Sequence, residues 1–394
     1  MSQLRVTCEC GQTAVVEMSK SKEPFTCTLC GREVHITPDN AKKVADQAPV
    51  TAAPASAPKE EKKLPSRVLC LDQLRGYAIF GMIMVNYLGY FGWMPHWFEH
   101  NKNHFSYADT IAPLFIFVVG MGFRLSLKAR AAKIGESAAL AQSAKRYVLL
   151  FVVGVLFYGP SFRVDWWDAM IQIGLSGLVA LFFINRPIAV RLGYGVFCLA
   201  LFSGIYFGTD YGDWMSHRSM NGGPLSPFTY VFVLLAGTIA YDMLDNLDGA
   251  VFLRNTLLTA AGLLVAGIVV LMILPKDTDT VREFGALTYT AKRWSVAPYI
   301  LISTSCAFLA FAIFYWVNEV KGIEIPHLSI LGMNPLAIYL LQYSLLEMRH
   351  SYLPEQYESA SANPLVGLTG YVIFYLIVYG FAKRLHNDKI IIKL

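Results

Sequence analysis

The hydrophobic pattern divides the chain at about residue 67. Residues 1–66 are rich in polar and charged side chains, whereas the remainder consists of long apolar segments separated by short polar stretches. An apolar segment of roughly 17 to 25 residues with few charges is long enough to cross a bilayer as a helix. We therefore expect an all-α polytopic membrane protein of about ten transmembrane helices, preceded by a small N-terminal domain. The predicted spans lie near residues 74–95, 109–127, 147–162, 168–185, 190–208, 225–242, 255–275, 295–317, 328–347 and 365–382.

The composition agrees with this interpretation. Of 394 residues, 55% are hydrophobic and only 15% are charged, whereas soluble proteins average about a quarter charged residues. The net charge of +5 lies mostly in the loops between apolar segments, so we expect no nucleic-acid partner. The beginning of the chain lacks the apolar core of a secretory signal peptide.

Four cysteines cluster near the N-terminus in the spacings that zinc sites use. Cys8 and Cys10 form a C-x-C-G pair, and Cys27 and Cys30 form a C-x-x-C-G pair. Thiolates spaced in this way can complete a tetrahedral zinc site from two tight turns. We expect a zinc ribbon over residues 1–38 with a structural Zn²⁺, because so short a domain has too little core to fold unaided. His35 is an alternative ligand or a strand residue.

Residues 39–66 are dominated by Ala, Pro, Lys and Glu and show no apolar periodicity, which predicts a disordered linker. A zinc ribbon needs reduced thiols, which places the N-terminus in the cytoplasm. Lysines and arginines in the short loops agree with that orientation, and an even number of spans returns the C-terminus to the cytoplasm. Lys276, Arg282, Lys292 and Arg293 fall on the opposite side and are the exception.

Polar residues interrupt the apolar segments at a few positions. Asp72 and Arg75 are spaced to pair at the start of the first span, either as a structural anchor or as part of a ligand site. Asn86 lies deeper in the same span, where its amide needs a partner, either another helix or a ligand. The sequence GMNP at 332–335 breaks a helix, so Asn334 is a candidate wall of a site.

Three histidines, His96, His100 and His104, lie in the loop between the first two predicted spans. This loop faces away from the cytoplasm in the predicted topology. Asp109 follows at the start of the second span. It can cap that helix, or it can orient a neighbouring imidazole, as carboxylates commonly do.

An ordered set of segments resembles a known family. The segments are LDQLRGYAIFGMIMVNYLG, the histidine loop, YADTIAPLFIFVVGMGF, DAMIQIGL, KRWSVAPYIL, LGMNPLAIYLLQ and the ending KIIIKL. Together, over residues 67–394, they resemble the membrane acyltransferases similar to heparan-α-glucosaminide N-acetyltransferase. The zinc ribbon and linker lie outside the resemblance.

The resemblance implies acetyl transfer from cytoplasmic acetyl-CoA to the amine of a glucosamine on the far side of the membrane. It also implies that a histidine of the first loop is catalytic. The family loop reads roughly H-x-x-W-x-G, and no Trp-Gly element follows a histidine here. His100 fits best by its distance from Asp109, His104 is the rival, and His96 is a weaker one.

We therefore expect His100 or His104 as base or acyl carrier, Asp109 as the orienting residue and Asn86 as a polar site residue. The predicted cofactor-binding residues for acetyl-CoA are Asp72, Arg75, Arg124, Lys128 and Asn334. Topology alone also explains the cations among them.

Two other functions fit the same residues. One is O-acetylation of a sugar hydroxyl, and the other is a transporter or sensor that uses the zinc ribbon as a cytoplasmic module. Beyond acetyl-CoA and an amino-sugar or glycan acceptor, the expected partners are membrane lipids and a second copy of the chain in a homodimer. We expect the inner membrane of a bacterium as the location.

Overall fold

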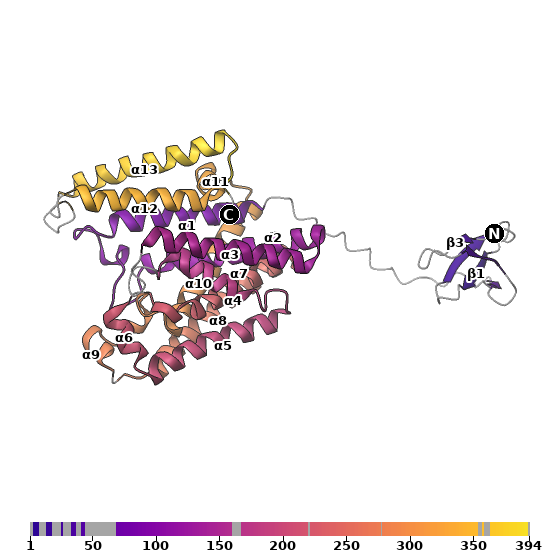
Figure 1. Cartoon of the computed structure of the whole chain (residues 1–394), viewed down its shortest axis with the longest axis horizontal. Coiled ribbons are helices and arrows are strands. Elements are labelled where there is room, and N and C mark those ends of the chain that lie inside the picture. The colour runs from indigo at the N-terminus through magenta and orange to yellow at the C-terminus, as the bar shows by residue number, and fades with distance from the viewer. Residues whose placement is uncertain are drawn as a thin grey trace. The chain divides into compact units, whose positions relative to one another are not determined.

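The computed structural model divides the chain into two compact units, Met1–Lys63 and Leu64–Leu394, which are drawn in Figure 1. Each unit is described by itself. The structure describes residues 3–7, 13–17, 25–26, 33–36, 41–43, 68–159, 167–219, 221–276, 278–353, 357 and 363–392.

The first unit contains short antiparallel strands. β1 (Gln3–Thr7) pairs with β2 (Thr13–Glu17) and with β5 (Ala41–Lys43), and β3 (Phe25–Thr26) pairs with β4 (Glu33–Val34). Apolar and polar side chains alternate in the sequences around β2 and β4, as is typical of short strands. β5 lies beyond residue 38, inside the segment predicted to be a linker. Its backbone pairs with the free edge of β1, and such pairing leaves no apolar pattern in the sequence.

The predicted zinc site falls between these strands in the sequence. Cys8 and Cys10 lie between β1 and β2, Cys27 and Cys30 lie between β3 and β4, and all four are outside the described residues. Within the described residues, no group of His, Cys, Asp and Glu side chains could hold a metal ion. Zinc binding therefore stays a prediction.

The second unit is helical throughout its described residues. Its elements are α1 (Leu69–Leu88), η2 (His96–Phe98), α2 (Ala108–Ile134), α3 (Glu136–Tyr158), α4 (Ala169–Ala180), α5 (Ile188–Gly208), α6 (Tyr211–Arg218), η3 (Gly223–Leu225), α7 (Pro227–Asn246), α8 (Gly249–Ile273), α9 (Asp279–Phe284), η4 (Thr288–Thr290), α10 (Ala297–Tyr315), the π-helix η5 (Trp316–Val320), α11 (Pro326–Met333), α12 (Pro335–Tyr352) and α13 (Pro364–Asn387).

Each of the predicted spans corresponds to a helix, but the number that could cross a membrane is smaller. Among the described residues, 7 helices are long and apolar enough, or 8 if α11 and α12, which meet at 86°, form one broken span. The count of about ten is not confirmed. α1 carries Asp72, Gln73, Arg75 and Asn86 in its apolar sequence, and α4 has only 12 residues.

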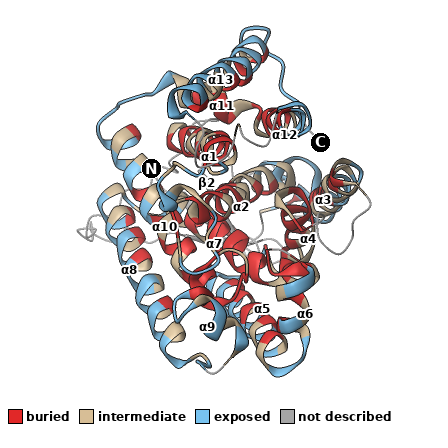
Figure 2. Cartoon of the chain, turned by 90° about the vertical axis from the view of Figure 1, so that its left-hand side faces the viewer, coloured by how far each residue is buried: buried red, intermediate tan, exposed pale blue. Residues whose placement is uncertain are grey.

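α2 and α7 form the centre of the unit, as the predominance of buried residues in Figure 2 shows. Their backbones touch at two glycines. A Cβ atom on Gly120 would lie 2.1 Å from the carbonyl oxygen of Leu234, and one on Gly237 would lie 2.0 Å from that of Phe117. Only glycine permits so close a crossing, and this crossing fixes the position of α2.

The outer helices expose apolar side chains instead of burying them. Leu258 and Met272 on α8, Leu156 on α3 and Leu365 on α13 are each more than 60% exposed. Exposed apolar surface of this extent on long helices is lipid-facing surface. The protein is thus an integral membrane protein.

A second apolar cluster lies beside the main core. Trp294 and Tyr289 pack there with Met215 of α6 and Phe202 of α5. Figure 1 shows α6 and α9 together at one end of the unit. This cluster forms a fixed support beside the histidine loop.

Candidate active site

His100 and Asp109 are joined by a hydrogen bond at the start of α2. His100 Nδ1 lies 2.8 Å from Asp109 Oδ1, and the Asp109 side chain is fully buried, whereas that of His100 is 41% exposed. A buried carboxylate therefore fixes the orientation of an imidazole whose other side is accessible.

The local sequence Ser-Tyr-Ala-Asp explains the position of Asp109. The backbone N–H of Ser106 donates to Asp109 Oδ2 at 3.2 Å, and the backbone N–H of Asp109 donates to Ser106 Oγ at 3.3 Å. This reciprocal arrangement resembles a capping box. Tyr299 of α10 adds a hydrogen bond from its hydroxyl to the Asp109 carbonyl. Asp109 thus has both of the roles considered from the sequence, since one oxygen caps the helix and the other accepts from His100.

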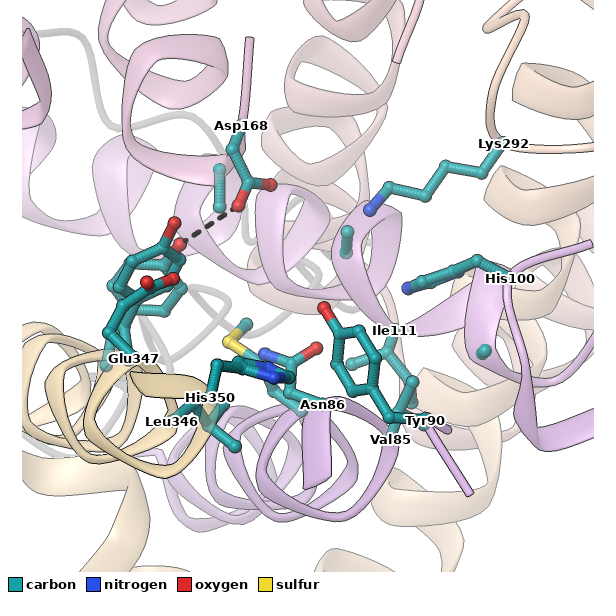
Figure 3. Close-up of a pocket in the computed structure, with 16 residues that line it drawn as sticks. Val85, Asn86, Tyr90, His100, Ile111, Asp168, Lys292, Leu346, Glu347 and His350 are labelled. Atoms are coloured by element: carbon teal, nitrogen blue, oxygen red, sulfur yellow. Dashed lines mark hydrogen bonds between the residues drawn. The ribbon is translucent and has the colours of Figure 1, made fainter. Parts of the chain in front are cut away.

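The partner of Nδ1 assigns the tautomer of His100. A carboxylate at this distance accepts a hydrogen bond from Nδ1, so in the neutral imidazole Nδ1 carries the hydrogen and Nε2 keeps its lone pair. Figure 3 shows the ring reaching into the pocket that His100 lines. In that tautomer Nε2 is a proton acceptor.

The loop that carries His100 is held by the segment before α10. Thr288 Oγ1 donates to the carbonyl of Lys102, the backbone N–H of Phe105 donates to Thr290 Oγ1, and Trp294 Nε1 donates to Thr288 Oγ1. Thr288 and Trp294 are fully buried. These contacts fix the part of the loop that leads into α2.

His100 faces a pocket of about 190 Å³. Its polar lining includes Asn86 of α1, Asp168 at the N-terminus of α4, Lys292 before α10 and Glu347 of α12, all shown in Figure 3. Sites for whole small molecules are commonly larger, at about 300 Å³ or more. The pocket is thus large enough for the reacting groups of two substrates but not for a complete CoA molecule.

Tyrosines support the wall of the pocket opposite α1. The hydroxyl of Tyr339 donates to Asp168 Oδ2 at 3.4 Å and lies 2.6 Å from the hydroxyl of Tyr158. The backbone N–H of Met170 donates to Tyr158. This chain of contacts connects α12 to the beginning of α4 and fixes the direction of the Asp168 carboxylate.

The other two histidines of the loop are placed differently. His104 is exposed and is not part of the pocket lining. The His96 side chain is 84% exposed and lies 3.6 Å from Glu99. Of the three histidines, only His100 combines the pocket with a buried carboxylate.

The predicted acetyl-CoA residues lie far from His100 along the helices. Arg124 follows Asp109 on α2 by about 15 positions, or roughly 22 Å of helix rise. Arg75 Nη1 lies 3.5 Å from Asp72 Oδ1 and 3.4 Å from the carbonyl of Gly332. The structure therefore brings Asp72 and Arg75 together beside the break between α11 and α12.

Asn334, at that break, is occupied by the chain itself. Its Nδ2 donates to the carbonyl of Ile390, and its Oδ1 accepts from the N–H of Ile392, both at 2.9 Å. The amide therefore fixes the C-terminal segment against the start of α12.

Arg124 and Lys128 belong to a cluster of charges around Asp242 of α7. Arg124 Nε lies 3.0 Å from Asp242 Oδ1, Lys128 Nζ lies 2.8 Å from the same oxygen, and Arg191 contacts Oδ2. Lys128 also contacts Asp245 at 2.9 Å. These cations are thus already paired within the protein.

Lys292, Glu347, His350 and Tyr90 line the pocket, and none of them was among the predicted site residues. One signal could have identified Lys292, because it is one of the four cations on the side opposite to that favoured by the positive-inside rule. Its neighbour Arg293 is structural. Arg293 donates to the carbonyl of Ser216, and burial lowers the pKa of its guanidinium.

Comparison with known proteins identifies a relationship over part of this unit. Residues 67–247 match the family model described as heparan-alpha-glucosaminide N-acetyltransferase, catalytic. The enzyme of that name from Mus musculus is 30% identical over 120 residues, which cover 29% of this chain and 18% of the mouse protein. The enzyme from Homo sapiens is 31% identical over 101 residues, which cover 25% of this chain and 15% of the human protein.

The chain spans less than a fifth of the length of these curated relatives. The match confirms the resemblance over residues 67–247, whereas the segments KRWSVAPYIL, LGMNPLAIYLLQ and KIIIKL lie beyond it. It includes Asn86, His100, Asp109 and Asp168, whereas Lys292 and Asn334 lie beyond residue 247.

Proposed function

We propose that the protein transfers an acetyl group from acetyl-CoA to the amine of an amino sugar or glycan, because residues 67–247 of this chain are related to the catalytic region of heparan-alpha-glucosaminide N-acetyltransferase. The observation that supports this most strongly is the pair of His100 and Asp109. It combines a proton acceptor, a buried orienting carboxylate and a pocket.

The chemistry requires such a base. An amine acceptor is mostly protonated at neutral pH and cannot attack a thioester until it loses a proton. That first proton passes to water, and the Nε2 lone pair of His100 accepts the second proton, which the nitrogen loses as the C–N bond forms. Asp109 stabilises the imidazolium that results. Asn86, on the neighbouring wall, is a polar group able to orient the acceptor or the acyl oxygen.

Acetyl-CoA supplies the acetyl group as a thioester, and its phosphates need cations. In our proposal Arg75 and Asp72 lie at the end of the unit where the nucleotide binds, and the histidine pocket receives the acetyl end. Arg75 lies beside Gly122 of α2, where a Cβ atom would be 3.1 Å from Arg75 Nη2, and Gly122 is roughly 20 Å of helix rise from Asp109, a length that the extended arm of CoA has to bridge. Arg124 and Lys128 contribute less, because their contacts with Asp242, at 3.0 and 2.8 Å, are shorter than the 3.5 Å contact of Arg75 with Asp72. Asn334 contributes less because the C-terminal segment occupies both atoms of its amide.

Two routes use the same residues. The acceptor amine can attack the thioester directly, with His100 as base, or His100 can take the acetyl group on Nε2 and pass it to the amine. In the second route a stable covalent intermediate would form in the absence of acceptor.

The test is acetyl transfer from labelled acetyl-CoA to glucosamine by the full chain in detergent or nanodiscs, together with equilibrium binding of acetyl-CoA. We expect saturable binding and accumulation of N-acetylglucosamine. Absence of both would contradict the proposal and favour a transporter or sensor, which moves or senses a solute without chemical change. Transfer to a sugar hydroxyl in place of the amine would establish the O-acetyltransferase alternative.

We further propose that the N-terminal unit binds one structural Zn²⁺ through Cys8, Cys10, Cys27 and Cys30, and that both termini lie in the cytoplasm. The spacing of the cysteines supports the first proposal, and the distribution of loop cations supports the second. Metal analysis of the purified protein and cysteine accessibility labelling from each side of the membrane test them.

A further inference from the structure

We propose that Lys292 is a catalytic residue whose ammonium group stabilises the oxyanion formed when the thioester is attacked. This inference rests on the proposed acetyl transfer and deepens it, because it adds the electrophilic partner of His100. The inference depends on three features of Lys292, namely its direction, its rigid backbone and its lack of a carboxylate partner.

The first feature is the direction of the side chain. Lys292 and His100 line the same pocket, although about 190 residues separate them in the sequence. Figure 3 shows the Lys292 side chain extending into the cavity between Asp168 and His100. A carbonyl group bound beside Nε2 of His100 would therefore lie within the region that the Lys292 ammonium group reaches.

The second feature is the backbone that carries Lys292. Ser295 has φ of 51°, a left-handed conformation that is uncommon for a residue with a side chain. Its N–H and its Oγ both donate to the Lys292 carbonyl, at 3.1 and 2.9 Å. The N–H of Gly222 donates to the Arg293 carbonyl, and the Trp294 side chain is fully buried. The turn is thus held firmly, which is what a preorganised catalytic group requires.

The third feature is that the ammonium group of Lys292 shares the pocket with Asp168 and Glu347 without an ion pair to either among the described residues. In the part of the chain that the structure describes, Lys292 makes no ion pair, whereas Lys128 contacts Asp242 and Asp245. Asp168 faces the same pocket and accepts from Tyr339 without pairing with Lys292. A cation directed into a cavity without a carboxylate partner is available to a developing negative charge.

In the reaction, the negative charge develops on one atom, the carbonyl oxygen of the thioester. The lone pair of the acceptor nitrogen forms a bond to the thioester carbon, and the π electrons of the carbonyl move to its oxygen. His100 takes a proton from the nitrogen. The oxyanion then re-forms the C=O bond, the C–S bond breaks, and the CoA thiolate leaves and takes the proton from the His100 imidazolium, which restores the base. Lys292 would hold the oxyanion in the intermediate, and it would do the same if His100 were first acetylated.

The test uses Lys292→Met with Lys276→Met as a matched control, because Lys276 is an exposed lysine outside the pocket. The substrates are acetyl-CoA and glucosamine, which carries no anionic group. We expect kcat of Lys292→Met to fall by about a hundredfold or more, as happens when one oxyanion donor is removed, with both KM values little changed. Lys292→Arg should recover part of kcat, and Lys276→Met should equal the wild type.

Two results would overturn the inference. Unchanged kcat would exclude a role in the transition state, and a raised KM for glucosamine at constant kcat would make Lys292 a residue for acceptor binding only. Retained acetyl-CoA binding and an unchanged melting temperature would show that Lys292→Met has folded. If Lys292→Met does not fold, the kcat of Lys292→Arg provides the test. Failure of the wild-type protein to transfer acetyl would instead contradict the proposed function.

Discussion

Two clusters of charged side chains occupy the helical unit, and they differ in how their charges are balanced. Around Asp242, the cations Arg124, Lys128 and Arg191 contact the same carboxylate. Around the pocket, His100 contacts Asp109, while Lys292 and Asp168 point into the cavity without contacting each other.

Burial alone does not separate the two clusters. Each contains a buried carboxylate, Asp242 at 5% exposed and Asp109 at 0%, and a partly exposed partner, Lys128 at 35% and His100 at 41%. The difference is that Asp242 contacts three cations, and one of them, Arg191, is only 2% exposed. Charges that are buried and paired with one another hold helices in place, because either partner alone would be costly to bury. Charges that are directed into a cavity remain available to a substrate. The Asp242 cluster therefore holds helices together, and the pocket remains our proposed site of chemistry.

The largest effect that separates the two regions is expected from Asp242→Asn. Loss of the carboxylate charge would leave Arg191 buried without its anionic partner, which typically costs about 3–5 kcal/mol. We expect a large loss of folded protein, measured by thermal unfolding in detergent. Asp245→Asn is the matched control, because Asp245 contacts only Lys128 within this cluster and is more exposed. Equal melting temperatures for the two variants would contradict a structural role for Asp242.

Asp109→Asn should reduce kcat by roughly a hundredfold, because loss of the carboxylate charge removes the group that orients His100 and stabilises the imidazolium. The expected loss of stability is smaller, about 1 kcal/mol from the weakened helix cap. Ser106→Ala serves as the control, since it removes the cap hydrogen bond and leaves the His100 contact. A similar loss of kcat in both variants would show that helix capping, and not orientation of the imidazole, is what matters.

A smaller effect should distinguish Arg75 of α1 from Lys128 of α2, two cations that lie far from His100 along the helices. Arg75→Ala should raise KM for acetyl-CoA by about tenfold, the consequence of losing one charged contact to phosphate, with kcat little changed. Lys128→Met should leave this KM unchanged, because Asp242 and Asp245 already occupy its ammonium group. The reverse result would place the nucleotide at the Asp242 cluster and contradict our separation of the two regions.

The sequence predicts those parts of the molecule that depend on neighbouring residues. The apolar segments predicted the positions of the helices, and the spacing of nine residues between His100 and Asp109 predicted a pair that the structure brings into contact. The loop histidine and its carboxylate lie on either side of one helix start, so local sequence determines their geometry.

Contacts between distant segments could not be predicted in this way. Asp242 lies 118 residues from Arg124, so no local pattern indicated that Arg124 and Lys128 are already paired with it. Lys292 and Glu347 reach the pocket from the segment before α10 and from α12, and only the excess of cations in that loop indicated an unusual role for Lys292. The tie between Asn334 and the C-terminal segment depends on backbone atoms of Ile390 and Ile392, which no side-chain pattern identifies.

The most direct test of the central claim compares His100→Ala with His104→Ala in the transfer of labelled acetyl from acetyl-CoA to glucosamine. His104 is in the same loop but outside the pocket, so its variant controls for any disturbance of the loop. We predict that His100→Ala loses at least about a hundredfold in kcat while it still binds acetyl-CoA, and that His104→Ala retains wild-type kcat. Loss of transfer in His104→Ala with full activity in His100→Ala would contradict the assignment of the pocket as the active site.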